Sequence, residues 1–167
     1  MNDKVLVAYA SIHGSTREIA EVVAASLQEK GFETELLPAR AVKKLDGYRA
    51  VVLGAPLYMF HWHKDARRFL TRFQRVLQND LPVAVFAGGP FSSGDEKEWQ
   101  EIERQLNQEL AKFPWLEPVS VELVGGRFDP AALRFPYSLI PALRQMPAND
   151  LRDWQKIKNW AGGLKLA

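Results

Sequence analysis

The 167-residue sequence contains no cysteine, which excludes disulfides, thiol redox chemistry and cysteine-ligated metal centres. Any redox role therefore requires a bound cofactor. No apolar run reaches the length of about 18 residues that spans a bilayer. The N-terminus, MNDKVLVAYAS, also lacks the basic start, apolar stretch and cleavage site of a signal peptide. We therefore expect a cytoplasmic location.

Several nucleotide-binding and metal-binding motifs are also missing. Neither G-x-G-x-x-G nor G-K-[ST] follows the first apolar stretch, which argues against an NAD-type site and a P-loop. The acidic residues of a phosphorelay receiver are replaced by Ala10-Ser11 and Leu53-Gly54. His61 and His63 have no third His, Cys or paired carboxylate nearby, so we expect no metal site. The net charge of +2 and the lack of a recognition motif argue against a nucleic-acid partner.

Length and composition indicate one ordinary globular domain, with 47% hydrophobic and 25% charged residues. The charge is unevenly distributed, because seven Lys/Arg but only three Asp lie between Gly125 and the C-terminus. This basic region is either a solvated face or a contact surface for an anionic partner or membrane.

The most informative stretch is VLVAYASIHGSTREIAEVV, from Val5 to Val23. Its opening apolar run is short and rich in β-formers, which predicts a strand. Ser15 and Glu18 have the spacing of a capping box, which predicts the start of a helix. The intervening turn directs backbone N–H groups, three hydroxyls and the positive end of a helix dipole to one point. This combination suits a phosphate dianion.

This stretch resembles the flavin mononucleotide (FMN) signature of flavodoxins. The signature places an aromatic residue, Ser or Thr, a small residue, Thr and Ala at fixed spacing, and these places are filled by Tyr9, Ser11, Gly14, Thr16 and Ala20. Ala8 is a departure, because a larger apolar residue is usual there. The resemblance implies an FMN cofactor whose phosphate contacts Ser11, Ile12, His13, Gly14, Ser15 and Thr16.

A second loop, GAPLYMFHWH (54–63), is more aromatic than a solvated turn requires. It follows a predicted buried strand at 50–53, and right-handed crossovers place the carboxyl ends of parallel strands at one edge. In flavodoxin-like proteins this loop holds one side of the flavin ring. The alternative is that its aromatic residues cover the following helix. The resemblance implies cofactor contacts from Pro56, Leu57, Tyr58, Met59 and Trp62.

A third loop, GGPFSSG (88–94), follows a predicted strand at 81–87. Its glycines allow the backbone to approach a ligand closely. By resemblance to flavodoxins, this loop meets the other polar edge of the ring, through Gly88, Gly89, Pro90 and Phe91.

The alternation of strands and helices predicts an α/β fold, and the resemblance to flavodoxins implies a doubly wound five-stranded parallel sheet in the order 2-1-3-4-5 with helices on both faces. We expect residues 1–167 to form a single flavodoxin-like FMN-binding domain. The remaining strands and helices are predicted at 32–37, 64–78, 93–113, 119–124 and 150–162.

An insert at about 125–149 is too long for an ordinary connection and too apolar for a disordered linker. An insert at this place resembles the flavodoxin branch that includes the menaquinone-dependent protoporphyrinogen oxidase. Three roles remain open for it: a wall that receives a planar hydrophobic substrate, a contact with a membrane surface, or packing on its own domain.

The resemblance implies an FMN-dependent oxidoreductase that passes electrons between an organic substrate and a quinone, with the chemistry at the flavin. One alternative is a non-enzymatic electron carrier that serves a protein redox partner. The apolar insert argues against a carrier, whereas the small single domain favours one. A second alternative is a scaffold without cofactor whose loops bind a partner protein. The insert adds the alternative of a peripheral contact with the inner face of the membrane.

Overall fold

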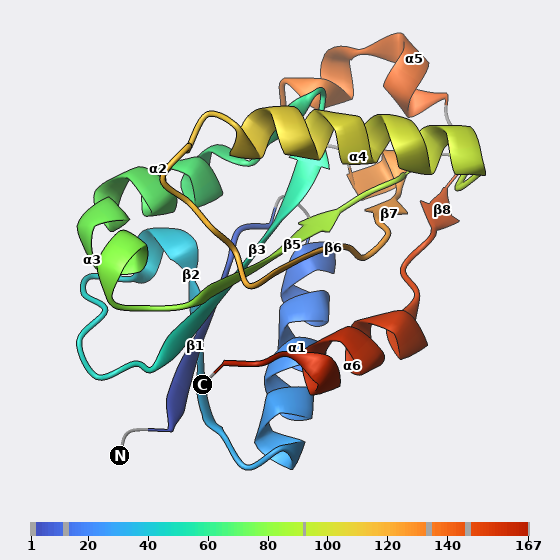
Figure 1. Cartoon of the computed structure of the whole chain (residues 1–167). Helices are drawn as coiled ribbons and strands as arrows, with labels where there is room; N and C mark the ends of the chain where they lie inside the picture. Colours follow the sequence, from blue (N-terminus) through green and yellow to red (C-terminus); the bar gives the residue numbers. More distant parts are fainter. Residues whose placement is uncertain (1–2, 12–13, 92, 133–134, 146–147, 167) are drawn as a thin grey trace.

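The sheet has the predicted strand order. The computed structural model describes residues 3–11, 14–91, 93–132, 135–145 and 148–166. Five parallel strands follow one another in the order β2-β1-β3-β5-β6, which is the expected 2-1-3-4-5 order because the short β4 lies off this path (Figure 1). Their bounds are β1 (Lys4–Tyr9), β2 (Glu33–Pro38), β3 (Ala50–Tyr58), β4 (His61–Trp62), β5 (Val83–Gly88) and β6 (Ser120–Leu123).

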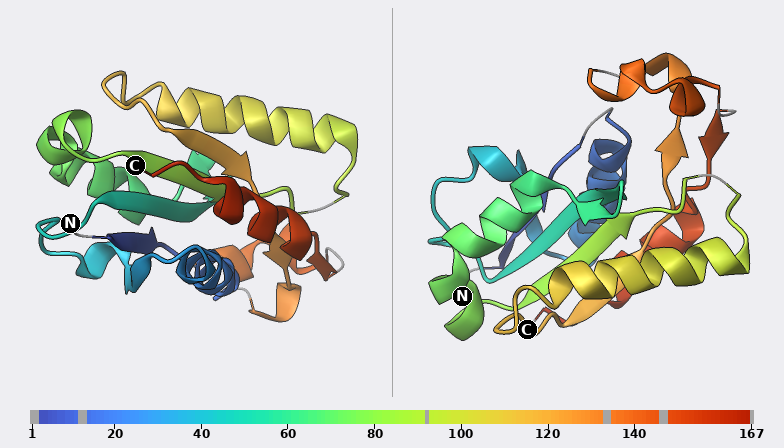
Figure 2. Two further views of the ribbon diagram at one scale, coloured as in Figure 1. Left: turned by 60° about the horizontal axis from the view of Figure 1, so that its bottom comes forward. Right: turned by 90° about the horizontal axis from the view of Figure 1, so that it is seen from above.

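Helices cover both faces of the sheet, and alternate residues of each strand face opposite cores (Figure 2). In β1, Leu6 and Ala8 pack in the core beneath α2, α3 and α4, whereas Val5 and Val7 pack beneath α1 and α6. The helices are α1 (Ser15–Glu29), α2 (Lys64–Arg72), α3 (Gln74–Asn79), α4 (Glu96–Leu110) and α6 (Trp154–Gly163), with a 3-10 turn η1 (Ala39–Ala41). In the described part of the chain, no helix is long and apolar enough to cross a bilayer.

The predicted insert begins and ends in a small antiparallel sheet of two strands, β7 and β8, which lies beside the carboxyl edge of the main sheet (Figure 1). Phe128 is buried, but Phe135 and Leu139 are 79% and 68% exposed. The insert therefore packs on the domain near its base and exposes apolar side chains farther out. Its elements are β7 (Arg127–Phe128), η2 (Pro130–Ala132), η3 (Tyr137–Leu139), α5 (Pro141–Arg144) and β8 (Asn149–Asp150).

Helix boundaries differ from the sequence prediction where an aspartate provides the cap. The predicted start of α4 near Ser93 is wrong, since the side chain of Asp95 accepts the N–H of Glu98. In the same way α6 begins after Asp153 rather than at residue 150, which pairs within β8. The single predicted helix at 64–78 is divided at Phe73 into α2 and α3.

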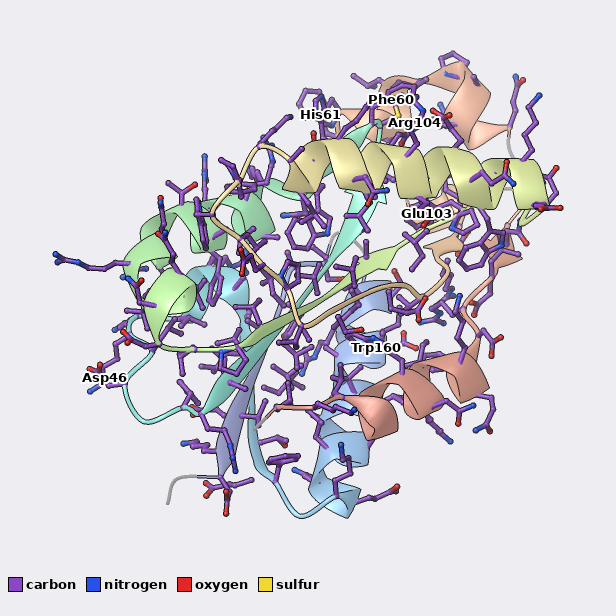
Figure 3. The ribbon with its side chains drawn as sticks, in the orientation of Figure 1. Asp46, Phe60, His61, Glu103, Arg104 and Trp160 are labelled. Atoms are coloured by element: carbon purple, nitrogen blue, oxygen red, sulfur yellow. The ribbon has the colours of Figure 1, made fainter. Side chains whose placement is uncertain are left out.

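The second predicted loop is partly a hairpin. β3 continues to Tyr58 and returns as β4, with Leu57 opposite Trp62 and Tyr58 opposite His61. The turn residues, Met59 and Phe60, have φ values of 51° and 71°, as a tight hairpin turn requires. The tip of the hairpin projects toward the insert at the carboxyl edge of the sheet (Figure 3).

Gly54 of β3 is required by the close approach of Phe86. A Cβ atom at Gly54 would lie 1.8 Å from Cζ of Phe86. The Phe86 ring is fully buried and meets Trp160 of α6 edge-on, with 6.0 Å between ring centroids. The core therefore has no room for a methyl group at this position.

We predict that Gly54→Ala lowers the free energy of unfolding by about 1–3 kcal/mol, because the added methyl group overpacks the core. Urea denaturation measures this change. Gly162→Ala is the matched control, since its Cβ would meet no atom within 4 Å and the position is helical. The control is expected to be neutral or stabilising by up to about 1 kcal/mol. Equal losses in both variants would contradict the packing explanation.

Candidate functional site

The turn between β1 and α1 has the geometry of an anion site. Gly14 is the N-cap residue, with a φ of 85°, and its N–H donates to Oγ of Ser11 at 2.8 Å. Among the described residues, no side chain caps this helix. The first-turn N–H groups of a helix have no partner within the helix, so those of Ser15, Thr16 and Arg17 suit an anion. The hydroxyl-bearing side chain of Thr16 is nearly fully buried at the same point.

The helix begins at Ser15, but the predicted capping box is wrong. Gly14 is the N-cap, and the carboxylate of Glu18 lies 3.2 Å from Nη1 of Arg152 instead of reaching back to the cap. The Arg152 guanidinium is held beside Glu18 by a bidentate pair with Asp150, so Glu18 pairs with it and not with the backbone N–H at the cap. The absence of a side-chain cap in the described turn leaves its N–H groups directed toward solvent or ligand.

Arg152 connects the end of the insert to this turn. Its side chain is only 4% exposed, and Nη1 donates to the carbonyl oxygen of Ser15 at 3.2 Å. The guanidinium holds the pKa of Asp150 below its usual value, chiefly through their hydrogen bonds. It also lies 4.7 Å from the ring of Trp154. Arg152 therefore fixes the position of β8 relative to the first turn of α1.

The three predicted loops meet at one place. A Cβ atom at Gly88 would lie 3.4 Å from Cα of Pro56 and 3.7 Å from Oγ1 of Thr16. Gly88 is the last residue of β5, and Pro56 lies near the end of β3. Thr16 lies in the first turn of α1. The rings of Tyr58 and Phe91 meet edge-on, with 5.7 Å between centroids. The loops expected to surround the cofactor are thus adjacent in space.

The base of the insert is hydrogen-bonded to the third loop. Gly125 and Gly126 donate to the carbonyl oxygens of Gly89 and Pro90, both at 2.9 Å. A Cβ atom at Gly126 would lie 2.3 Å from Cε1 of Phe91, so the ring packs directly over this glycine. The insert therefore determines where Phe91 lies relative to the hairpin.

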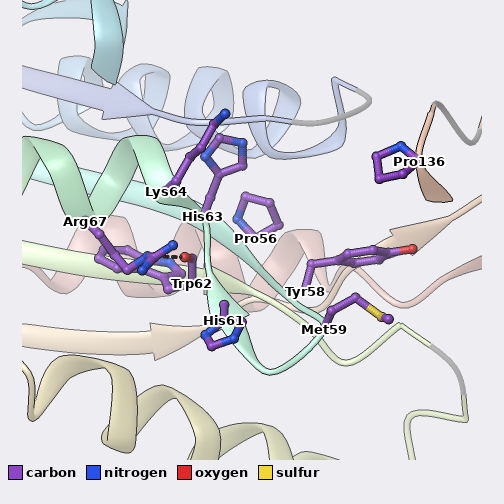
Figure 4. Close-up of a pocket in the computed structure, with 9 residues that line it drawn as sticks. All are labelled: Pro56, Tyr58, Met59, His61, Trp62, His63, Lys64, Arg67 and Pro136. Carbon is purple, nitrogen blue, oxygen red and sulfur yellow. Dashed lines mark hydrogen bonds between the residues drawn. The ribbon is translucent and has the colours of Figure 1, made fainter.

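A cavity of about 380 Å³ opens beside the hairpin (Figure 4). Tyr58, Met59 and Pro136 lie toward one end, while Lys64 and Arg67 lie toward the other. One end is therefore apolar and the other is cationic. The full lining is Pro56, Tyr58, Met59, His61, Trp62, His63, Lys64, Arg67 and Pro136.

Not every predicted contact residue presents its side chain to this site. Leu57 and Trp62 are buried in the core, and Nε1 of Trp62 donates to the carbonyl oxygen of Ala55 at 3.0 Å. Trp62 borders the cavity but chiefly stabilises the hairpin that forms its wall. The predicted contacts at Ile12 and His13 lie outside the described residues.

Glu109 of α4 holds the β3–β4 hairpin in place through the backbone of Trp62. Its buried carboxylate accepts the backbone N–H of Trp62 at 3.1 Å and pairs with Lys112 at 2.6 Å. Burial opposes ionisation, but these two contacts outweigh it, and the pKa of the carboxyl is lowered. Nδ1 of His61 lies 3.5 Å from the same carboxylate.

His63 joins the hairpin to α2. The backbone N–H of His63 donates to the carbonyl oxygen of Pro56. The ring Nδ1 of His63 accepts the backbone N–H of Asp65 at 3.0 Å. Burial is the main reason that the pKa of His63 is lowered, so the ring is neutral at pH 7. Since Nδ1 is an acceptor, the ring proton lies on Nε2.

Sequence reasoning missed five of the cavity residues: His61, His63, Lys64, Arg67 and Pro136. The two histidines were noticed only as an incomplete metal site. Arg67 lies on the polar face of a predicted helix, and periodicity does not reveal that a hairpin lies beside this face. No signal in the sequence places Pro136 opposite Tyr58.

A parallel sheet whose ligand loops meet between β1 and β3, where the strand order reverses, defines the flavodoxin-like class of α/β proteins. A family model described as "Flavodoxin domain" matches residues 6–139. The chain therefore belongs to the flavodoxin domain family, which confirms the resemblance identified from its residues.

Known relatives agree with this assignment. The chain is 21% identical over 168 residues to "Protoporphyrinogen IX dehydrogenase [quinone]" of Escherichia coli strain K12, covering 95% of this chain and 92% of that protein. It resembles oxidised flavodoxin 2 of Bacillus cereus with a TM-score of 0.59 and 20% identity, covering 95% and 94% of the two chains. For rubredoxin oxygen:oxidoreductase of Desulfovibrio gigas, the TM-score is 0.54 and the identity 18%. There the match covers 95% of this chain but only 34% of the other.

Flavodoxins bind FMN, and family membership gives FMN as the cofactor of this chain. The described residues fit this group. The first turn of α1 offers N–H donors and hydroxyls to a phosphate, and a Cβ at Gly14 would meet nothing within 4 Å, so the turn is open to a ligand. Tyr58 and Phe91, whose rings meet edge-on between the hairpin and the third loop, offer aromatic surface that suits a flat ring.

We predict that the double variant Ser11→Ala/Thr16→Ala binds FMN at least tenfold more weakly. Each lost hydrogen bond to a charged phosphate is worth about 1.5–3 kcal/mol. Quenching of flavin fluorescence measures the dissociation constant. Riboflavin, which lacks the phosphate, is the control ligand and should bind both proteins equally. Parallel weakening of FMN and riboflavin would contradict a phosphate contact at this turn.

We predict that Glu109→Gln lowers the free energy of unfolding by about 1 kcal/mol at pH 7, because the exposed partner Lys112 limits the gain from the ion pair. A carboxyl with a lowered folded pKa stabilises the protein above its ordinary value of 4.5. This contribution is lost as the pH falls through the folded pKa. Urea denaturation at several pH values measures the difference.

The matched control is Glu103→Gln, which changes an exposed carboxylate on the same helix (Figure 3). It should leave stability nearly unchanged. A constant difference between Glu109→Gln and wild type at all pH values would show that charge is not the cause.

Proposed function

We propose that this protein is an FMN-dependent oxidoreductase that passes electrons from an organic substrate to a quinone, as a protoporphyrinogen dehydrogenase does. The observation that carries this proposal is the cavity beside the hairpin. Pro136 of the insert forms part of its wall, opposite Tyr58 (Figure 4). A carrier needs only an accessible cofactor edge, whereas an enzyme needs a place for its substrate.

The curated relative supports the same proposal. Its printed name specifies protoporphyrinogen IX and a quinone, and the match extends over 92% of its length. The apolar insert at 125–149 is the feature on which the resemblance to this branch rests. The absence of cysteine in this chain also assigns the redox chemistry to the cofactor.

Within this proposal, residues 1–167 form one domain and three loops hold the cofactor. Ser11 to Thr16 bind the phosphate, while Pro56 to Trp62 and Gly88 to Phe91 flank the ring. FMN supplies the redox chemistry when bound. In each round of the reaction, two electrons and two protons leave the substrate and convert one quinone to a quinol. Three such rounds, with three quinones, convert a porphyrinogen to its porphyrin. The residues of the chain orient the reactants and exclude water around them.

A flavodoxin-type electron carrier is the second candidate function. The likeness to flavodoxin 2 over 94% of that chain favours it. The exposed hairpin tip, with Met59 at 46% and Phe60 at 68% exposure, would then contact a redox-protein partner. The structure gives this candidate a surface but no use for the cavity.

Peripheral contact with a membrane belongs to the enzyme proposal, because many quinones are dissolved in bilayers. Phe135 and Leu139 of the insert are exposed and apolar, and the basic Arg144 follows them. Such a composition suits the boundary between lipid headgroups and acyl chains.

We predict that the FMN-loaded protein oxidises protoporphyrinogen IX under anaerobic conditions only when a quinone is present. Porphyrin fluorescence measures the product, and quinone absorbance measures the acceptor. A faster reaction with quinone in anionic vesicles than with an equal amount in detergent would support the membrane contact.

A protein that binds FMN but oxidises no porphyrinogen with any quinone, while a flavodoxin reductase reduces it rapidly, would be a carrier. That result would contradict the enzyme proposal and leave the cofactor assignment intact.

A further inference from the structure

We propose that Arg152 is a positioning residue for the cofactor, because it neutralises Glu18 beside the turn that receives the doubly charged phosphate of FMN. Arg152 thereby contributes to the preference of the site for FMN over riboflavin, which has no phosphate. This inference rests on the phosphate contacts of the proposed function and deepens them. It does not depend on the identity of the organic substrate or of the electron acceptor.

Glu18 places a negative charge beside the candidate phosphate site. It lies in the first turn of α1, whose open N–H groups begin at Ser15. A carboxylate at this position stabilises the helix without ligand, because it interacts with the positive end of the helix dipole. The same charge repels a phosphate dianion at that end of the helix. An unpaired Glu18 would therefore weaken the binding of the cofactor.

Two arginines lie beside the carboxylate of Glu18. Nη1 of Arg152 is 3.2 Å from one oxygen, and Nη1 of Arg127 is 4.0 Å from the other. The side chain of Arg152 is 4% exposed and that of Arg127 is 47% exposed. An exposed pair at the longer distance contributes little, whereas solvent screens a buried guanidinium much less. Arg152 is therefore the principal counter-ion of Glu18.

Other contacts hold the Arg152 guanidinium in this position. Nε and Nη2 donate to the two carboxylate oxygens of Asp150 at 2.9 and 2.8 Å. Nη1 donates to the carbonyl oxygen of Ser15 at 3.2 Å, and the ring of Trp154 lies 4.7 Å from the guanidinium carbon. A side chain fixed in this way loses little further freedom when the cofactor binds.

Loss of the Arg152 charge would leave an excess of negative charge beside the first turn of α1. In the described structure, the carboxylates of Asp150 and Glu18 are balanced by Arg127 and Arg152. With glutamine at position 152, one exposed arginine faces both carboxylates. This excess opposes a ligand with two negative charges but not riboflavin, which is neutral. The contribution of Arg152 is therefore specific for the phosphate.

The insert, and not α1, determines where Arg152 lies. The N–H of Leu151 donates to the carbonyl oxygen of Gly126 at 2.8 Å, near the start of the insert. The Leu151 side chain lies against the third loop, since a Cβ atom at Gly94 would be 3.2 Å from its Cδ1. The arginine beside the first loop is thus supplied by a segment that also contacts the third loop.

Apoprotein is titrated with FMN and with riboflavin, and quenching of flavin fluorescence measures both dissociation constants. We predict that Arg152→Gln weakens FMN binding about tenfold and leaves riboflavin binding unchanged, because only FMN carries the repelled charge. Rising salt should reduce this effect. Glu18→Gln/Arg152→Gln should return FMN affinity to within about threefold of the wild-type value, since both members of the pair are removed. Arg152→Lys should retain most of the FMN preference, because it keeps the charge.

Arg49→Gln is the matched control. Arg49 also pairs with a carboxylate, that of Asp3, and lies 5.6 Å from the ring of Phe32. It directly precedes β3, at the amino edge of the sheet and away from the cofactor loops. This variant should keep the full preference for FMN. A loss equal to that of Arg152→Gln would overturn the proposal, since the preference would then reflect the overall charge of the protein.

Equal weakening of FMN and riboflavin in Arg152→Gln would overturn the proposal, because the arginine would then have only a structural role. Failure of the double variant to recover FMN affinity would overturn it as well, since Glu18 would not be the source of the repulsion. Glu18→Gln alone, which keeps the fixed guanidinium, should bind FMN at least as tightly as wild type. Weaker binding would contradict a repulsive Glu18.

The same titrations separate this proposal from the one on which it rests. If Ser11→Ala/Thr16→Ala loses the preference for FMN while Arg152→Gln keeps it, the phosphate contacts stand and the role of Arg152 is refuted. Equal affinity of the wild-type protein for FMN and riboflavin would refute the phosphate contacts, and this inference with them. The assay requires no turnover, so a failure to oxidise porphyrinogen leaves its outcome unchanged.

Discussion

The position of the site depends on the parallel pairing of β1 with both of its neighbours. Residues Val5 to Ala8 have no exposed surface, because the strand is covered on both faces and paired at both edges. Parallel pairing forces β1, β3 and β5 to end at the same edge. The turn after β1, the end of β3 and the end of β5 consequently meet around Gly88.

Contacts from outside the sheet then fix these loops. Glu109 of α4 holds the hairpin through the N–H of Trp62, while Arg152 holds the first turn of α1 through the carbonyl of Ser15. The third loop is hydrogen-bonded to the start of the insert. Each of the three loops is therefore attached to an element outside the sheet. The insert contributes to two of these attachments, which makes it part of the site and not an appendage.

Much of the fold could be predicted from the sequence. The strand β1 and the helix α1 follow from β-propensity and periodicity, and the strand order follows from the resemblance to flavodoxins. The capping partner could not be predicted, because Glu18 pairs with Arg152, which is 134 residues away in sequence. The hairpin after β3 was missed because its turn residues, Met59 and Phe60, are not the Asn and Gly that usually mark such turns.

The candidate site could be predicted less completely. The three loops were identified correctly as neighbours, because each follows a parallel strand. The cationic end of the cavity was missed, since Lys64 and Arg67 lie on a helix face whose neighbour depends on the hairpin. Periodicity shows which residues face away from the core, but it does not show what lies beside them.

A crystal structure of the protein with bound FMN tests the central claim most directly. The account predicts that the phosphate lies within hydrogen-bond distance of the N–H and hydroxyl groups of Thr16, with the ring against the hairpin at Tyr58. A phosphate bound at any other place, with the first turn of α1 facing only solvent, would contradict it.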